Sequence, residues 1–321
     1  GRTIGIGQDD GLVDAREARY SETSVATTDL GFFMSLETRA LHPLFGVEII
    51  GADIAEPIAD DVFADIRTAL DEHSLLLVRG AKMTDDRQVA FSEKFGPVLK
   101  ATSNNPGGGT PFSRQSNLDI ATGERIPVDD RRMVYQRANE LWHSDSSYRA
   151  TPSLCSLLSG RLVPPEGGAT EFTSMRAAWD ALPQDKQDSL EKLIAEHSLF
   201  NSRQQVDPRV MSEEQKKETP PVRQAVVRRN PENGRKNLFI GAHASHIIGQ
   251  PEETGRALLI ELLDFGTQPK FVYRHEWQAD DLIVYDNRCL LHRATPYDTQ
   301  RHRRLLQRTT VAGDGPTAPQ E

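Results

Sequence analysis

Hydrophobic and polar positions along the chain predict a mixed fold in which short strands dominate the second half. Apolar residues three or four positions apart predict helices at Ala59–Glu72, Thr84–Phe95, Met175–Leu182, Gln184–Glu196 and Pro251–Phe265. Short runs bounded by turn residues predict strands at Val47–Ile54, Ser74–Val78, Cys155–Val163, Leu238–Gly241, Lys270–Trp277, Leu282–Tyr285 and Leu305–Val311. Strands and helices do not alternate regularly, so we expect a β-sandwich or jelly roll with flanking helices rather than a doubly wound sheet.

Three segments lack such a pattern. Residues 102–130 are rich in Asn, Gly, Pro and Ser, which predicts a long mobile loop. Residues 201–235 form a charged, proline-containing excursion between two patterned regions. Residues 1–33 are polar and without clear periodicity, so we interpret them as an N-terminal extension or leader. We therefore expect one domain over residues 34–321.

Composition narrows the class of protein. Over 321 residues, 37% are hydrophobic and 26% are charged, which is enough for a sizeable core. The net charge of −9 argues against nucleic acid as a partner. No run approaches the ~18–20 apolar residues of a membrane span. The two cysteines, Cys155 and Cys289, lie in apolar runs and are expected to be reduced and buried. We expect a cytoplasmic homo-oligomer that acts on a small molecule.

The sharpest local signal is Trp142-His143-Ser144-Asp145. In an extended strand, side chains two positions apart face the same side, so His143 and Asp145 are expected to converge. An imidazole and a carboxylate on one side of a metal need a third ligand from elsewhere in the chain. By itself, a histidine two residues before an aspartate is more often a hydrogen-bonded polar pair than a metal site.

A distant histidine strengthens the metal interpretation. His292 ends an apolar run that follows a predicted strand and a tight polar turn, Asp286-Asn287-Arg288. Two histidines and one carboxylate on one face leave three coordination positions open, the arrangement of non-haem Fe(II) oxygenases. The competing pair is His243 and His246, which lack helical periodicity and an acidic partner, and which we expect to have a structural or supporting role.

Two arginines near the C-terminus are candidates for anion binding. If residues 304–311 form a strand, Arg304, Leu306 and Arg308 share one face of it. A charge run is usually a solvated surface, yet arginines on an inward face require anions to pair with. Arginine can bind a carboxylate through two parallel hydrogen bonds, which suits a dicarboxylate cosubstrate and an acidic substrate.

At this point the sequence resembles a known family. The segments WHSDSSY, PPEGGATEF, YDNRCLLHRA and RRLLQRTT resemble, in this order, the taurine dioxygenase / 2,4-dichlorophenoxyacetate dioxygenase family. NELWHSDSSY, KNLFIGAHASH and FVYRHEW are most similar to its 2,4-dichlorophenoxyacetate branch, and the resemblance covers residues 41–312. It implies a double-stranded β-helix of the cupin-like jelly-roll type, Fe(II), O2 and 2-oxoglutarate.

The resemblance also implies roles for individual residues. His143, Asp145 and His292 match the metal ligands. Thr170 and Arg304 match residues that bind 2-oxoglutarate, and Arg308 matches the arginine that receives the acidic group of the substrate. The sequence departs from the family in the loop after Pro97, where relatives offer a basic or histidine side chain to the substrate, and Lys100 is the candidate there.

The sequence thus predicts a 2-oxoglutarate-dependent dioxygenase. Its substrate is expected to be a small carboxylate, above all an aryloxyalkanoate that is cleaved to a phenol and glyoxylate with release of succinate and CO2. The alternatives are a sulfonate or other small-anion hydroxylase, a non-catalytic jelly-roll sensor that binds an organic acid, and a zinc hydrolase. A zinc hydrolase would need a general base, and no glutamate is adjacent to the three ligands.

Overall fold

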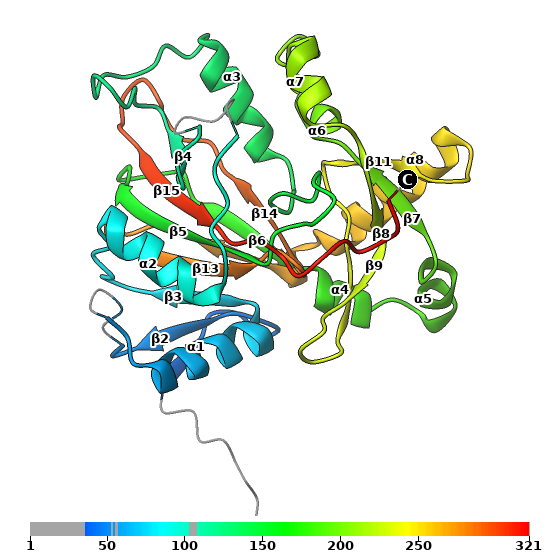
Figure 1. Ribbon diagram of the computed structural model, residues 1–321, viewed down its shortest axis with the longest axis horizontal. Coiled ribbons are helices and arrows are strands. Elements are labelled where there is room, and N and C mark those ends of the chain that lie inside the picture. Colours follow the sequence, from blue (N-terminus) through cyan, green and yellow to red (C-terminus); the bar gives the residue numbers. More distant parts are fainter. Residues whose placement is uncertain (1–35, 53, 55–56, 103–107, 321) are drawn as a thin grey trace, which may run out of the picture. The chain divides into compact units, whose positions relative to one another are not determined.

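A computed structural model describes residues 36–52, 54, 57–102 and 108–320. Its centre is a seven-stranded sheet that faces a smaller three-stranded sheet (Figure 1). In spatial order the large sheet consists of β1 (Glu37–Ala40), β2 (Val47–Ile50), β3 (Leu75–Val78), β13 (Leu282–Asp286), β5 (Cys155–Leu162), β15 (Leu305–Thr310) and β4 (Ser113–Ser116). The small sheet consists of β12 (Val272–His275), β6 (Thr170–Ser174) and β14 (Leu290–Ala294).

One hydrophobic core fills the space between these two sheets. Leu77, Leu158 and Ile283 from the large sheet pack with Phe172 and Leu290 from the small one. All pairings within the two sheets are antiparallel except that of β2 with β3. This arrangement of two facing sheets, each burying one face, confirms the jelly roll expected from the sequence.

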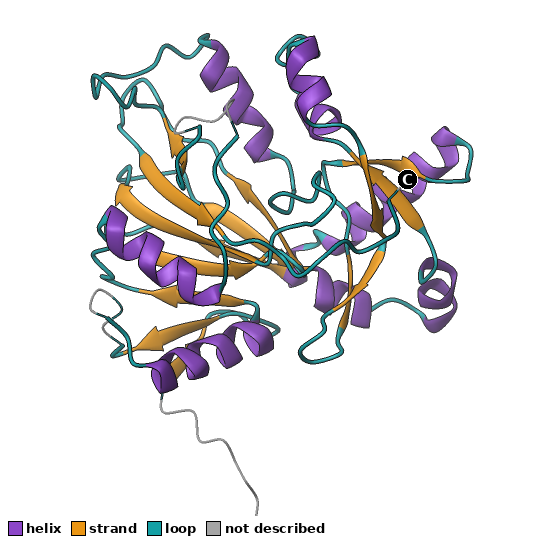
Figure 2. Cartoon of the chain, viewed as in Figure 1, coloured by secondary structure: helices purple, strands orange, loops and turns teal. Residues whose placement is uncertain are grey.

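Helices cover the outside of the strands (Figure 2). The helices and 3-10 turns are α1 (Asp60–His73), α2 (Asp85–Phe95), α3 (Arg131–Arg137), η1 (Ala138–Glu140), α4 (Met175–Asp180), α5 (Gln184–Leu190), α6 (Leu199–Gln204), α7 (Glu213–Glu218), α8 (Glu252–Gly266) and η2 (Pro269–Phe271). Helices α1 and α2 lie side by side against the large sheet and share a second core with it. None of the described helices is long and apolar enough to cross a membrane.

A third group of strands lies outside these two sheets, and we call it the outer wall. It consists of a three-stranded sheet of β11 (Ala244–Ile247), β7 (Ile194–His197) and β8 (Val222–Ala225), and a pair of β10 (Lys236–Leu238) and β9 (Val227–Arg229). Helix α8 packs on β11, with α4 and β10 in the same core.

The structure corrects several expectations. The helix expected over Gln184–Glu196 ends at Leu190, because Ile194–His197 pairs with β8 and β11 from distant parts of the chain. The expected strand at Leu238–Gly241 lies earlier, at Lys236–Leu238. The segments 102–130 and 201–235, expected as a loop and an excursion, contain regular elements instead, since β4 pairs with β15, and β8 and β9 join the outer wall. The interpretation of residues 1–33 falls outside the described residues.

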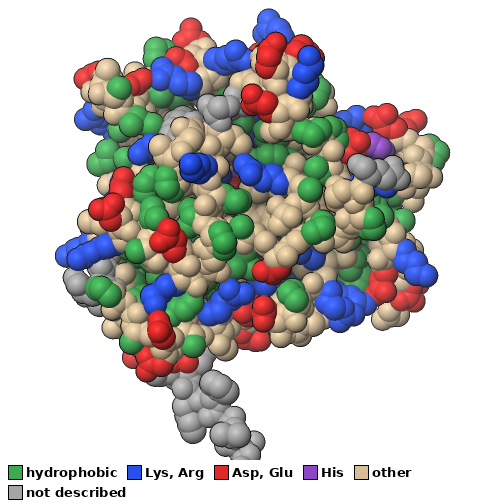
Figure 3. Space-filling view, viewed as in Figure 1, with side chains coloured by type: hydrophobic (Ala, Val, Ile, Leu, Met, Phe, Trp, Pro, Cys, Tyr) green, Lys and Arg blue, Asp and Glu red, His purple; other side chains and the backbone are tan. Residues whose placement is uncertain are grey.

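The remaining elements agree with the sequence to within a few residues at their ends. Thr84 caps α2 as expected, since its hydroxyl accepts a hydrogen bond from the backbone N–H of Arg87. Cys155 and Cys289 are free and buried, which confirms the expectation of two unpaired thiols. On the face in Figure 3, basic and acidic side chains of the described residues are interspersed and form no extended basic surface.

The contact between α8 and β11 depends on a glycine. A Cβ placed on Gly255 would lie 2.6 Å from the backbone nitrogen of Ile247 and 3.0 Å from its Cβ. Both are parts of the strand that cannot rotate away. The helix can therefore approach β11 this closely only where its side chain is a hydrogen atom.

We predict that Gly255→Ala lowers the free energy of unfolding. Forcing one extra carbon into a packed contact costs about 1–3 kcal/mol, and the better helix propensity of alanine returns at most about 1 kcal/mol. Urea unfolding followed by circular dichroism measures the difference. Thr254→Ala, on the exposed side of the same helix, is the matched control and should lose no stability. Equal or higher stability of Gly255→Ala would contradict the close contact.

Candidate metal centre

Two backbone hydrogen bonds place two histidines side by side. His143 and His292 form an isolated antiparallel bridge, in which His143 N–H donates to the His292 carbonyl (3.1 Å) and His292 N–H donates to the His143 carbonyl (2.9 Å). His292 lies in β14, whereas His143 lies in a loop that is extended only locally. The extended backbone that the spacing argument assumed at His143 is thus provided by a single bridge and not by a strand.

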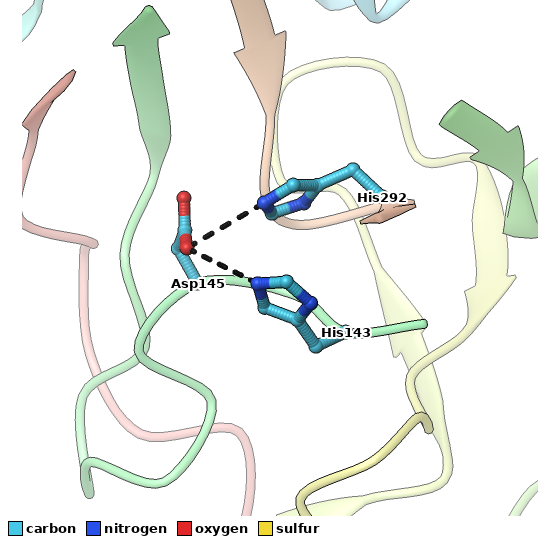
Figure 4. Close-up of side chains that lie close together, drawn as sticks. All are labelled: His143, Asp145 and His292. Atoms are coloured by element: carbon cyan, nitrogen blue, oxygen red, sulfur yellow. Dashed lines mark ion pairs between the residues drawn. The ribbon is translucent and has the colours of Figure 1, made fainter. Parts of the chain in front are cut away.

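Asp145 completes the cluster in Figure 4. Its Oδ1 lies 3.9 Å from His143 Nε2 and 3.7 Å from His292 Nε2. The backbone reverses at Ser146, whose φ of 59° is in the left-handed region, so the chain turns away directly after the carboxylate. One ligand atom from each of the three residues lies within 4.8 Å of the others. The structure thus brings together the three residues that the sequence singled out.

Hydrogen bonds fix the orientation of these three side chains. His143 Nδ1 contacts the Leu141 carbonyl at 2.7 Å, which leaves Nε2 with its lone pair toward Asp145. The other carboxylate oxygen, Asp145 Oδ2, accepts hydrogen bonds from Tyr285 (2.7 Å) and Ser156 (2.8 Å). Oδ1, which faces the two histidines, accepts a hydrogen bond from Arg308, so the carboxylate is oriented at both oxygens.

Burial sets the charge of the cluster. Desolvation lowers the pKa of His143 to about 4 and that of His292 well below its ordinary value, so both imidazoles are neutral at pH 7. Burial alone would raise the pKa of Asp145, but the guanidinium of Arg308, the two neighbouring histidines and the hydrogen bond from Tyr285 together outweigh burial and keep the pKa below its usual range. Two neutral nitrogens and one carboxylate oxygen, all buried, are the donor set that suits Fe(II) with open positions.

Arg304 lies in a second buried position beside the three residues. It is 5% exposed, its Nε has no hydrogen-bond partner, and one terminal nitrogen donates to the Gly168 carbonyl at 3.1 Å. Among the described residues no carboxylate pairs with it, and burial lowers its pKa to about 10. Gly168, whose carbonyl accepts this bond, has a φ of +67°, a backbone conformation that favours glycine. A buried guanidinium in this state needs an anion.

Thr170 and Arg304 line the same small cavity as His143 and His292. The Thr170 hydroxyl accepts a hydrogen bond from the indole N–H of Trp277 at 2.9 Å, which orients it. Leu306 and Arg308 line this cavity too, so Arg304, Leu306 and Arg308 share the face that the strand pattern predicted. Gln307 points the other way, where it donates to Asp85.

A second cavity opens on the other side of Arg308. Arg308 and the exposed Lys100 both line it, together with His143 and Asp145. The structure therefore places Lys100 at the rim of a pocket that reaches the metal-binding residues. His243 also lines this pocket, but its Nδ1 contacts Ser147 at 3.0 Å, and His246 contacts Ser245 and Glu196. Neither joins the three-residue cluster within the described chain.

Sequence reasoning missed other residues of these cavities. Gln115 and Asn139 line both, and they line a third cavity of about 240 Å³ beneath α3 as well. The Asn139 amide donates to Gln115 Oε1 at 2.6 Å, so this one hydrogen bond borders all three spaces. Gln115 lies in the segment expected to be a loop, and no motif marked it. Asn139 stood inside NELWHSD, four residues before His143, which was the available signal.

Comparisons with known proteins identify a family over most of the chain. The family model described as taurine catabolism dioxygenase TauD, TfdA family matches residues 37–310. The chain is 43% identical over 282 residues to the alpha-ketoglutarate-dependent 2,4-dichlorophenoxyacetate dioxygenase of Cupriavidus pinatubonensis, a match that covers 87% of this chain and 98% of the relative. It is 34% identical over 284 residues to the (S)-phenoxypropionate/alpha-ketoglutarate-dioxygenase of Sphingobium herbicidovorans, covering 85% and 94%.

A solved structure is similar over nearly the whole chain. It is the crystal structure of AAD-2 in complex with Mn(II) and N-oxalylglycine, with a TM-score of 0.83 and 36% sequence identity. The match covers 89% of this chain and 100% of AAD-2.

We predict that His143→Ala, Asp145→Ala and His292→Ala each lose iron binding and turnover while the fold is retained. Each substitution removes one of three buried donors, and two remaining donors hold an ion weakly. Anaerobic iron titration with circular dichroism measures both properties. His246→Ala, which lies outside the cluster, is the control and should bind iron as the wild type does. Full iron content in any of the three variants, or loss of iron in folded His246→Ala, would require another set of ligands.

Proposed function

Because this chain belongs to the taurine catabolism dioxygenase TauD, TfdA family, we propose that it hydroxylates aryloxyalkanoates, with iron as its metal and 2-oxoglutarate as its cosubstrate. The chain spans nearly the full length of relatives named for 2,4-dichlorophenoxyacetate and (S)-phenoxypropionate. One observation in the structure carries the dioxygenase chemistry: the buried Arg304, with which no carboxylate of the described residues pairs, lines the same cavity as the two neutral histidines of the cluster.

The residues present suit both bound groups. His143, Asp145 and His292 would hold the metal through three converging atoms. Arg304 would pair with the distal carboxylate of 2-oxoglutarate, and the hydroxyl of Thr170 would orient the same molecule. Iron, when bound, would supply the redox chemistry by which O2 gives one oxygen atom to succinate, as 2-oxoglutarate loses CO2, and the other to a substrate C–H bond.

The chain's own contribution is placement and exclusion of water. Arg304 and Thr170 fix the cosubstrate on one side of the cluster, and Arg308 and Lys100 bind the acidic group of the substrate on the other. Leu158, Tyr285 and Leu306 keep the intervening space largely apolar. A substrate held by its carboxylate presents the adjacent ether carbon for hydroxylation. The product is a hemiacetal, which collapses to a phenol and glyoxylate when the substrate is an aryloxyacetate.

A sulfonate or another small organic anion is the alternative substrate class, because a guanidinium binds a sulfonate as readily as a carboxylate. The decisive experiment is a substrate panel with purified, iron-loaded protein, in which succinate and phenol are measured together. We expect equal amounts of succinate and phenol with aryloxyacetates. Succinate formation stimulated by a sulfonate but by none of the aryloxyalkanoates would reject the proposed substrate and retain the reaction type.

We further propose that the enzyme acts in the cytoplasm, which is supported by its two free, buried thiols. The homo-oligomer expected from the sequence stays a prediction, to be tested by light scattering coupled to size-exclusion chromatography.

Arg304, directly before β15, and Arg308, within it, should bind different molecules, namely 2-oxoglutarate and the substrate. Loss of a hydrogen-bonded charge pair that leaves its partner buried costs about 2–5 kcal/mol, or about 30- to several-thousand-fold in affinity. Arg304→Ala should raise the 2-oxoglutarate requirement by such a factor, including in the uncoupled reaction without substrate. Arg308→Ala should raise the substrate requirement and largely spare the uncoupled reaction. Steady-state kinetics in which each ligand is varied separately measure both effects.

Arg303→Ala is the matched control, because Arg303 is exposed and faces away from the cavities. It should change neither requirement. If Arg308→Ala weakened 2-oxoglutarate binding and Arg304→Ala spared it, the assignment of the two arginines would be reversed.

A further inference from the structure

A third arginine lies in the wall of the substrate pocket. Arg203, from α6, is 8% exposed and lines the cavity that His143, Asp145 and Arg308 also line. Its Nε has no hydrogen-bond partner, and one terminal nitrogen donates only to the hydroxyl of its neighbour Ser202, at 3.2 Å. No carboxylate of the described residues lies within ion-pair distance of it.

The charge of Arg203 is compensated differently from that of Arg308 in the same pocket. A buried guanidinium is costly unless an anion or several acceptors compensate for the water that it has lost. Arg308, in the same pocket, is compensated by Asp145. Besides its hydrogen bond to Ser202, Arg203 has a cation–π contact with Tyr135, whose ring centroid lies 4.4 Å from the guanidinium carbon. The pocket therefore holds one guanidinium that is already paired with a carboxylate and another that is not.

The position of Arg203 is fixed by its helix. Ser198 caps α6, and Asn201 donates to the carbonyls of Ala242 (3.0 Å) and Ala244 (3.1 Å). These bonds tie the helix to the chain around β11 and hold the guanidinium against Tyr135. A preordered guanidinium loses little entropy when it binds a ligand. The site is built before any ligand arrives.

We infer that Arg203 is a specificity-determining residue whose guanidinium pairs with the acidic group of the primary substrate. The inference rests on the proposed function and deepens it, because it adds a contact that selects acids over neutral ethers of the same shape. The rings of Tyr135, Tyr148 and His243 line the same pocket and suit the aryl part of such a substrate. Arg308 and Arg203 together would hold one carboxylate between two guanidinium groups.

The test compares 2,4-dichlorophenoxyacetate with its neutral primary amide. For Arg203→Gln, we expect kcat/KM for the acid to fall about 10- to 100-fold and that for the amide to change less than about threefold. The requirement for 2-oxoglutarate and the uncoupled formation of succinate should stay as in the wild type, because Arg203 does not line the cavity of Thr170 and Arg304. Arg203→Lys should recover part of the preference for the acid.

A purely structural role would give another result. If Arg203 only supports Tyr135, its loss would slow the acid and the amide equally, and an unchanged ratio of acid to amide would overturn the inference. Arg203→Met keeps an apolar stem over the ring and provides a second variant should glutamine disturb folding. Arg209→Gln, which removes an exposed arginine whose side chain is 88% accessible, is the control for loss of charge and should retain the wild-type ratio.

Arg149 is the competing candidate, because it lines the same pocket and its Nε is also without a hydrogen-bond partner. It is less buried than Arg203. If Arg149→Gln and not Arg203→Gln abolished the preference for the acid, the inference would be wrong. Wild-type protein that consumes neither ether would instead reject the proposed substrate. The same ratio, measured with an alkylsulfonate and its sulfonamide, would then decide the role of Arg203.

Discussion

The exchange of two backbone hydrogen bonds between His143 and His292 is the constraint on which the site depends. These residues are 149 positions apart in the sequence, and the bridge aligns their rings without a continuous strand around His143. Because β14 belongs to the small sheet, the position of His292 is inherited from the jelly roll itself. Asp145, only two residues after His143, then lies with its carboxylate close to both rings. The loop can therefore position His143 and Asp145 because one of them is hydrogen-bonded to His292, which the small sheet holds in place.

The two arginines beside this cluster differ in how their charges are balanced, and this difference suits two ligands. Arg308 pairs with Asp145, whereas no carboxylate of the described residues pairs with Arg304. The protein gives up stability by burying Arg304 unpaired, since such a group is costly until an anion arrives. That cost is useful, because binding energy becomes available where a dicarboxylate has to be held in one orientation.

The sequence was sufficient to predict the metal ligands and the two arginines beside them, but not the other residues that line the pockets. The shared face of Arg304 and Arg308 follows from strand geometry, and the ligands follow from residue type and family resemblance. The strand at Ile194–His197 was mistaken for helix because its partners come from distant segments, and pairing of that kind leaves no local periodicity. Helix α7 was not predicted, although Ser212 and Gln215 have the spacing of a capping box in the sequence. Arg203 carried no signal, since only tertiary packing shows that it is buried.

The hydrogen bond between Gln115 and Asn139 has a consequence for how this enzyme can diverge. Lys100, Tyr135 and Arg203 border the substrate pocket alone, so selection can vary them and leave the cosubstrate cavity intact. Gln115 and Asn139 border every one of these cavities, so a change in either alters both binding steps at once. We therefore expect new substrate specificities to arise by substitution of Lys100, Tyr135 or Arg203, whereas Gln115 and Asn139 should rarely change.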